Sequence, residues 1–183
     1  MKSAYLLVAA LFLAGLTSCH NQQPTGEVPA GGGKARKQVV EVEPIESGKV
    51  VAGQTIYVPA YSSIYTSDRA HRFDLAVTLS VRNTDQDHPM ILTKARYYDQ
   101  DGQVIREYLK KPLRIGPMAS TEFFVSESDT KGGVSASFLV EWVAEQSITA
   151  PVVESVMVGT LSGQGVSFTC PGRVLDDRSH SVK

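Results

Sequence analysis

The stretch FDLAVTLSV, residues 73–81, decides the fold class, because every second side chain in it is large and apolar. The positions between hold aspartate, alanine, threonine and serine. A period of two is typical of a β-strand with one face on a core and the other in water. A helix would place apolar side chains at i, i+3, i+4 and i+7, and no window of the chain sustains that spacing. The sequence therefore predicts an all-β domain.

Further runs of β-branched and aromatic residues, separated by turn residues, continue this pattern. Residues 90–98 and 103–109 predict a hairpin whose turn, DQDG, ends in a glycine suited to a left-handed position. Residues 134–143 and 152–158 are apolar on both parities, which predicts central strands covered on two faces. The strands predicted besides these hairpin strands and residues 73–81 are 54–60, 119–126, 135–144, 152–160 and 165–170, and the two apolar runs overlap the third and fourth of them. These strands predict a single two-sheet antiparallel β-sandwich of immunoglobulin-like type, with an open β-barrel as the alternative.

An apolar N-terminal run ends in Leu16-Thr17-Ser18-Cys19, which resembles the lipobox of bacterial lipoproteins. The run is too short to cross a hydrocarbon core of about 30 Å. The resemblance implies that a signal peptide is removed and that Cys19 becomes the mature N-terminus, carrying diacylglycerol and an N-linked fatty acid such as palmitate. Since His20 follows where an aspartate would retain the protein in the inner membrane, we expect attachment to the outer membrane, facing the periplasm.

Residues 20–37 contain two prolines, a triple glycine and almost no large apolar side chains. Such a segment cannot bury enough surface to offset the entropy of folding, so it predicts a flexible tether. The expected organisation is a signal peptide at 1–18, a lipidated N-terminus and tether at 19–50, a β-sandwich domain at 51–175 and a polar tail at 176–183.

The charge balance excludes nucleic acid as a partner. Removal of residues 1–18 takes away one charged side chain, Lys2, so the 18 basic residues become 17 against 19 acidic residues, a formal charge of −2. Nucleic-acid binding needs a net basic face. We therefore expect the partners to be the membrane, through Cys19, and an envelope protein or peptidoglycan.

Tyr57, Tyr61 and Tyr65 fall within nine residues of an expected edge or loop. They are candidates for an aromatic patch that binds peptide, glycan or a protein, and the alternative is that they cap the core. Arg96 and Arg106 lie on adjacent predicted strands near several glutamates. They are candidates for a charged recognition face, and the alternative is cross-strand ion pairing.

Metal binding and catalysis find little support in the sequence. Two acidic turns, Asp85 with Asp87 and Asp99 with Asp101, offer oxygen ligands that Ca²⁺ prefers, but a nine-residue strand of about 30 Å separates them. Turn capping accounts for them better. The four histidines share no metal-ligand spacing, and no Gly-x-Ser-x-Gly motif occurs. We therefore expect no metal, no cofactor and no enzymatic activity, with Cys170 buried as the remaining thiol.

Several segments resemble an uncharacterised family of bacterial lipoproteins that is catalogued as a domain of unknown function, over about residues 55–173. The resemblance rests on residues 57–65, 79–85, 96–109, 116–125 and 138–142. It brings no activity, cofactor or catalytic residue. More loosely, a Tyr-Asp-x-x-Gly hairpin followed by Pro-x-Ala-Ser-x-x-Phe resembles the small immunoglobulin-like domains of many envelope lipoproteins, which implies a fold and no function.

These observations together predict a lipid-anchored protein of the cell envelope that acts without catalysis, by binding or by supporting an assembly. One alternative is a domain that binds a small ligand or metal. A second alternative is a hydrolase whose site the sequence does not reveal.

Overall fold

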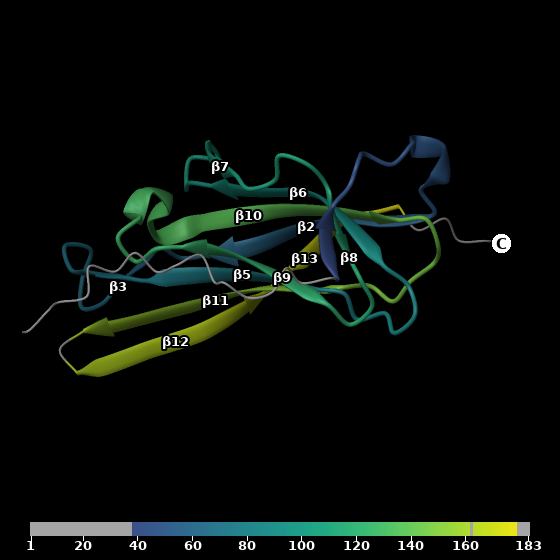
Figure 1. Ribbon diagram of the computed structural model, residues 1–183. Coiled ribbons are helices and arrows are strands. Elements are labelled where there is room, and N and C mark those ends of the chain that lie inside the picture. Colours follow the sequence, from purple (N-terminus) through teal and green to yellow (C-terminus); the bar gives the residue numbers. More distant parts are fainter. Residues whose placement is uncertain (1–37, 162, 179–183) are drawn as a thin grey trace, which may run out of the picture. The chain divides into compact units, whose positions relative to one another are not determined.

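Two antiparallel sheets hold most of the chain in the computed structural model, which describes residues 38–161 and 163–178. The larger, seven-stranded sheet has the order β1-β8-β6-β10-β2-β13, with β7 paired to β6. Its strands are β1 Val39–Glu41, β2 Ala52–Ala60, β6 Met90–Tyr98, β7 Val104–Glu107, β8 Leu113–Ile115, β10 Ala136–Ala144 and β13 Arg173–Asp177. Figure 1 shows this sheet stacked on the smaller one, with β6, β10 and β2 in one layer and β5, β11 and β12 in the other.

The smaller sheet has four strands in the order β12-β11-β5-β9. They are β5 Ala76–Arg82, β9 Ser120–Val125, β11 Val152–Leu161 and β12 Gln164–Pro171. A two-stranded ribbon, β3 Ser63–Tyr65 with β4 Arg72–Asp74, and two 3₁₀-helices, η1 Ser47–Lys49 and η2 Thr130–Ser135, complete the regular structure of the described residues. The sheets do not close into a barrel. The predicted β-sandwich is confirmed and the open-barrel alternative is wrong, while the immunoglobulin-like assignment stays a prediction.

The alternation in residues 73–81 has the predicted effect. Val77, Leu79 and Val81 are fully buried between the sheets, and the residues between them reach partial exposure. The single predicted strand is nevertheless wrong in its start, because the chain divides at Leu75 into β4 and β5. The Leu75 N–H donates to the Ser62 carbonyl oxygen at 2.9 Å, so β4 pairs with β3 while β5 pairs with β9 and β11.

The predicted hairpin forms with β6 at the expected residues 90–98. Gly102 has a φ of 76°, the left-handed conformation expected of it, and the Asp99 N–H donates to the Gln103 carbonyl oxygen at 3.0 Å. The returning strand β7 is shorter than predicted and ends at Glu107, although the Tyr108 N–H still donates to the Ala95 carbonyl oxygen at 3.0 Å.

The two strands predicted to be covered on both faces behave differently. Strand β10 is largely buried on both faces, as predicted. Strand β11 is not, because Val152 and Val158 are 43% and 47% exposed on the outer face of the smaller sheet. At one end of the outer face of β10, Val143 lines a groove together with Ile45 and Val50 of residues 42–51, while Leu139 and Glu141 stay half-buried. The prediction for β11 is therefore wrong.

The first and last strands of the seven-stranded sheet contain residues that were expected in the tether and in the tail. Strand β1 pairs with β8 although it was expected within the tether, and Asp176 and Asp177 belong to β13 although they were expected in the tail. Between β12 and β13 the chain passes from one sheet to the other at Gly172, where a Cβ would lie 2.6 Å from Ile56 Cγ2. Strand β1 has three residues, which are too few to show a period of two.

No helix in the described part of the chain is long and apolar enough to cross a membrane.

Candidate functional site

The three tyrosines predicted to form a binding patch have different surroundings. Tyr57 lies on β2, which β10 and β13 flank, so the expectation of an edge strand or loop is wrong there. Tyr61 packs against the core with its ring centroid 5.8 Å from that of Phe168. Tyr65 ends β3, and the Arg72 guanidinium carbon lies 5.5 Å from the centre of its ring. Of these three, Tyr57 alone is on the seven-stranded sheet.

The structure brings Tyr57 and Arg96 into one cross-strand row. Leu139 on β10 is the register partner of Tyr57 on one side and of Arg96 on the other. Since neighbouring strands lie about 4.8 Å apart, the two outer backbones of this row are about 10 Å apart. Beside the row, the surface is hollowed into an open depression of about 360 Å³, the tyrosine depression, lined by Tyr57, Tyr98, Gly102, Ser137 and Leu139.

Strand alternation explains why these side chains share the outer face. On β10, Phe138 and Val140 are fully buried in the core, so Ser137 and Leu139 point to the opposite side. On β6 the buried Tyr97 likewise turns Tyr98 outward. Sequence reasoning missed Tyr98, Ser137 and Leu139 as site residues. The alternation of each strand was visible, but only the register of β10 against β2 and β6 shows that they meet.

Cross-strand ion pairs neutralise two of the positive charges near the tyrosine depression, those of Arg96 and Lys94. Arg96 Nε donates to a Glu107 carboxylate oxygen across β6 and β7. This hydrogen bond is the largest cause that raises the pKa of Arg96, and a hydrogen bond with the Tyr98 side chain is the second. On the same face, Lys94 Nζ lies 2.5 Å from Glu141 Oε1. Arg96 and Lys94 thus have acidic partners, Arg173 on β13 is the register partner of Tyr57 and adds a positive charge beside it, and the depression itself is lined by uncharged groups.

Arg106 faces away from the tyrosine depression. Its register partner is the buried Tyr97, so it takes the opposite parity from Glu107. Arg106 Nη2 donates to Asp129 Oδ2 at 2.8 Å, and its guanidinium carbon lies 5.5 Å from the centre of the Tyr108 ring. Of the two candidate arginines, Arg96 alone shares the outer face and the cross-strand row with Tyr57, with Leu139 between them.

Comparison with known proteins identifies the domain. The family described as "Protein of unknown function (DUF3124)" matches residues 53–175. The chain belongs to this family. No curated protein matches it. A solved structure, described as "Crystal Structure of Thermotoga maritima 1070", is 14% identical, covers 66% of this chain and 92% of its own, and has a TM-score of 0.40.

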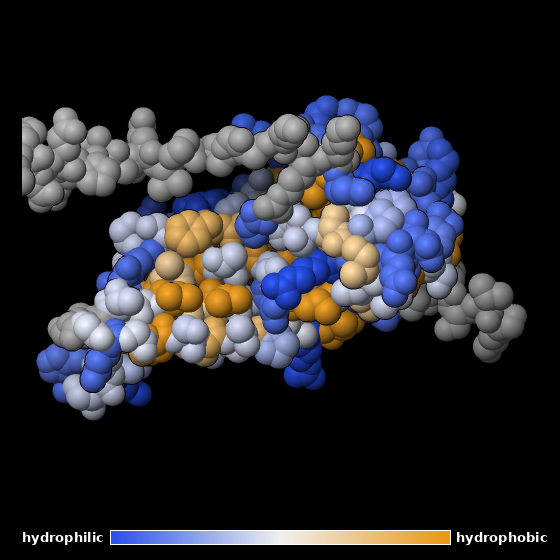
Figure 2. Space-filling model, turned by 60° about the horizontal axis from the view of Figure 1, so that its bottom comes forward, coloured by the Kyte–Doolittle hydropathy of each residue, from blue (hydrophilic) through white to orange (hydrophobic). Residues whose placement is uncertain are grey.

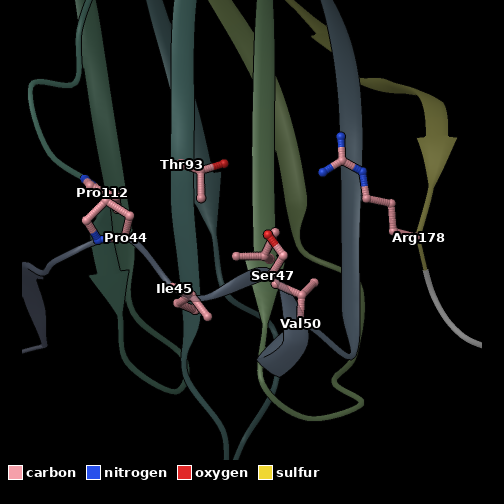
Figure 3. A pocket seen from close by; sticks show the side chains of 8 residues that line it. Pro44, Ile45, Ser47, Val50, Thr93, Pro112 and Arg178 are labelled. Carbon is pink, nitrogen blue, oxygen red and sulfur yellow. The ribbon is translucent and has the colours of Figure 1, made fainter.

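Every residue of the tyrosine depression lies within the DUF3124 match. A second, larger groove of about 780 Å³ lies on the same sheet, partly outside the match, where residues 42–51 cross β6 and β10. In Figure 3, Ile45, Ser47 and Val50 lie together on one side of this groove, while Thr93, Pro112 and Arg178 come from separate parts of the fold. Arg178 Nε lies 3.3 Å from Asp176 Oδ2, so its charge is also paired.

The acidic turns of the DUF3124 domain hold the backbone. The Asp85 carboxylate accepts backbone N–H groups from Thr149 at 2.9 Å, Asp87 at 3.0 Å and His88 at 2.8 Å. These three bonds lower the pKa of Asp85 to about 2, and the bond from Thr149 contributes most to that shift. Asp99 accepts the N–H groups of Asp101 and Gln103 in the same manner. Both turns therefore have the capping geometry that the sequence favoured over calcium binding.

We expect Asp85→Asn to destabilise the DUF3124 domain at neutral pH, because an amide offers one acceptor oxygen where the carboxylate offers two and a charge. The depressed pKa makes the stabilisation by Asp85 complete above about pH 4 and progressively lost as the pH falls towards 2. Chemical unfolding between pH 2 and 7 should show the wild type and the variant converging at the acid end. Asp87→Asn is the control, since that side chain accepts none of the three bonds; a constant gap between wild type and Asp85→Asn would contradict the prediction.

The remaining candidates for chemistry do not converge. Among the described residues, no group of three or more histidine, cysteine, aspartate or glutamate side chains is placed to hold a metal ion. Cys170 on β12 is a free thiol, half-buried against the core, and burial raises its pKa. Cys19, His20 and His180 lie outside the described residues. The tyrosine depression is thus the site that best combines the predicted residues with a shaped surface.

Proposed function

We propose that the protein is a lipid-anchored component of the cell envelope whose β-sandwich binds another envelope protein, without catalysis, through the tyrosine depression. The lipobox-like segment ending at Cys19 supports the anchor and a periplasm-facing position on the outer membrane. The observation that carries the binding role is the depression itself, in which Tyr57 and Tyr98 flank a floor of Leu139 and Ser137. Membership of the family adds no activity of its own.

The lining of the depression favours contact binding. Tyrosine offers a large apolar ring with a polar tip, and it loses little conformational entropy when it binds. The leucine floor suits an apolar side chain from a partner, while the hydroxyl groups of Ser137 and the tyrosines suit its backbone. The lining holds hydroxyl groups, but it contains no histidine, carboxylate, amine or thiol that would activate them for acid–base or nucleophilic chemistry.

A partner protein fits this lining better than a glycan strand. Peptidoglycan sugars present many hydroxyl groups, and each one that is buried needs a partner. The depression offers three hydroxyl-bearing side chains, those of Tyr57, Tyr98 and Ser137, beside the apolar side chain of Leu139. Peptidoglycan therefore stands as the competing outcome of the experiment.

The experiment replaces Tyr57 with a photo-reactive amino acid in the full-length protein and cross-links it by light in intact cells. We expect an adduct with an envelope protein, identified by mass spectrometry at native abundance. The control carries the same amino acid at Tyr65, which is 43% exposed where Tyr57 is 38% exposed but lies on the separate β3–β4 ribbon. Leu139→Asn should reduce the yield from position 57.

Two results would refute this function. One is the absence of any protein adduct from position 57 when the full-length protein is present in the envelope. The other is recovery of peptidoglycan fragments alone. An equal yield from positions 57 and 65 would also count against the depression, because it would show capture by proximity to the membrane surface.

A further inference from the structure

The exposed edges of the two large sheets differ in charge. An edge strand presents unpaired backbone groups to which another chain can add, and charged side chains commonly protect it. Four strands that have a single pairing partner follow this rule: β1 has Glu41, β7 has Arg106 and Glu107, β9 has Glu122, and β13 has Arg173, Asp176 and Asp177. Strand β12 is the exception.

Strand β12, Gln164–Pro171, reads QGVSFTCP and contains no charged residue. Within the described residues it pairs with β11 alone. In an antiparallel ladder, alternate residues direct their N–H and C=O groups to opposite sides, so about half of those on β12 point away from β11. Proline, which lacks an N–H, stands only at the last position. Strand β12 is thus a long, uncharged edge.

The outer face of the smaller sheet is also uncharged in the two rows that hold Ser167 and Thr169 of β12. Register places Thr169 beside Val156, Thr78 and Phe124 in one row, and Ser167 beside Val158 and Ala76 in the next. Phe124 is 57% exposed. Figure 2, which brings this side of the molecule forward, shows apolar and pale side chains gathered across it. Charge returns in the next row, where Glu154 is the register partner of Pro171 and its Oε1 lies 2.9 Å from Arg82 Nη1.

We propose that a second copy of this chain adds antiparallel to β12, so that two four-stranded sheets join across a two-fold axis into one continuous sheet. A two-fold axis places each strand against its own copy, so any charge near the axis would repel itself. Alone among the edges compared above, β12 meets that condition. Its exposed Ser167 and Thr169 also suit direct pairing with hydroxyl side chains from the partner strand.

This pairing is independent of the tyrosine depression, which lies on the other sheet. An extended segment of a different protein would satisfy the same backbone groups, but it would leave the purified protein monomeric. The oligomeric state of the purified full-length protein therefore separates the two occupants.

The test measures the mass of the full-length protein in a density-matched detergent by sedimentation equilibrium. We expect a dimer for the wild type and a dissociation constant weakened roughly tenfold or more by Thr169→Lys, since the two copies would bring like charges together. Leu175→Lys is the matched control: Leu175 is 59% exposed on β13, the edge of the other sheet, and this variant should remain dimeric. Circular dichroism checks that both variants fold.

A second measurement keeps the proposal testable if Thr169→Lys fails to fold. Cysteine at position 167 or 169 should give a disulfide-linked dimer on mild oxidation, above the background of the wild type, whereas cysteine at position 175 should not. A monomeric wild type at its highest soluble concentration would overturn the proposal. Equal dissociation by Thr169→Lys and Leu175→Lys would overturn it as well.

Discussion

Replacement of Cys19 by alanine is expected to abolish diacylglycerol attachment and to move the protein from the membrane to the soluble fraction. Each buried methylene contributes about 0.8 kcal/mol, so one acyl chain holds a protein only marginally while two or three hold it firmly. In the proposed function, Cys19 of the lipobox-like segment carries these chains. In that proposal the diacylglycerol is attached through the sulfur, so its removal takes away both chains of the diacylglycerol and leaves at most one N-linked chain. The change in distribution should therefore be close to complete.

The measurement combines cell fractionation with metabolic labelling by a fatty acid. Cys170→Ala is the matched control, because it removes the other cysteine of the chain and leaves the N-terminal segment intact. This control should keep both its label and its membrane association. A Cys19→Ala variant that keeps its full fatty-acid label would show that Cys19 is not the attachment site.

Phe138→Ala should produce the largest loss of stability. Phe138 is fully buried at the centre of the core, where its ring centroid lies 4.9 Å from that of Tyr97 and 6.3 Å from that of Tyr108. Truncation of a buried phenylalanine removes its transfer free energy and leaves a cavity, at a cost of about 3–5 kcal/mol. That loss is a large part of the 5–15 kcal/mol that stabilises a typical domain. The melting temperature should fall by roughly 10 °C or more.

Phe124→Ala provides the matched control for this prediction. It removes the same atoms from the outer face of the smaller sheet, where the side chain is 57% exposed. Denaturant unfolding should show a change of about 1 kcal/mol or less. Similar losses for the two variants would mean that Phe138 does not occupy the core between the sheets.

The strands that sequence reasoning found are the long ones. Strand β6 matches its predicted residues, and β5, β10 and β11 begin or end within a few residues of theirs, because a long strand shows either a period of two, as β5 does, or a sustained apolar run, as β10 and β11 do. Strands β1, β3 and β8 have three residues each and were not predicted. They form because a neighbouring strand offers free backbone groups, which is a property of the assembled sheet.

The candidate site was predictable only in part. Tyr57 and Arg96 were recognised as residue types suited to binding, and the structure places them in one row. Leu139 and Tyr98 carry no signal of their own, because a leucine or tyrosine on a strand reads equally well as core. Tyr61 was recognised as a residue type suited to binding, but its half-buried ring packs against Phe168 and the core.

The sequence by itself determined the all-β class, the parity of the long strands and the lipobox-like segment that ends at Cys19. These follow from local chemistry, because alternation and short motifs are read from adjacent residues. Tertiary structure alone decided which strand lies beside which, and with that the tyrosine depression, the one-sided burial of β11 and the uncharged edge at β12. Register and strand order depend on contacts between residues far apart in the chain, such as Leu139 with Tyr57 and Arg96, and no local pattern encodes such contacts.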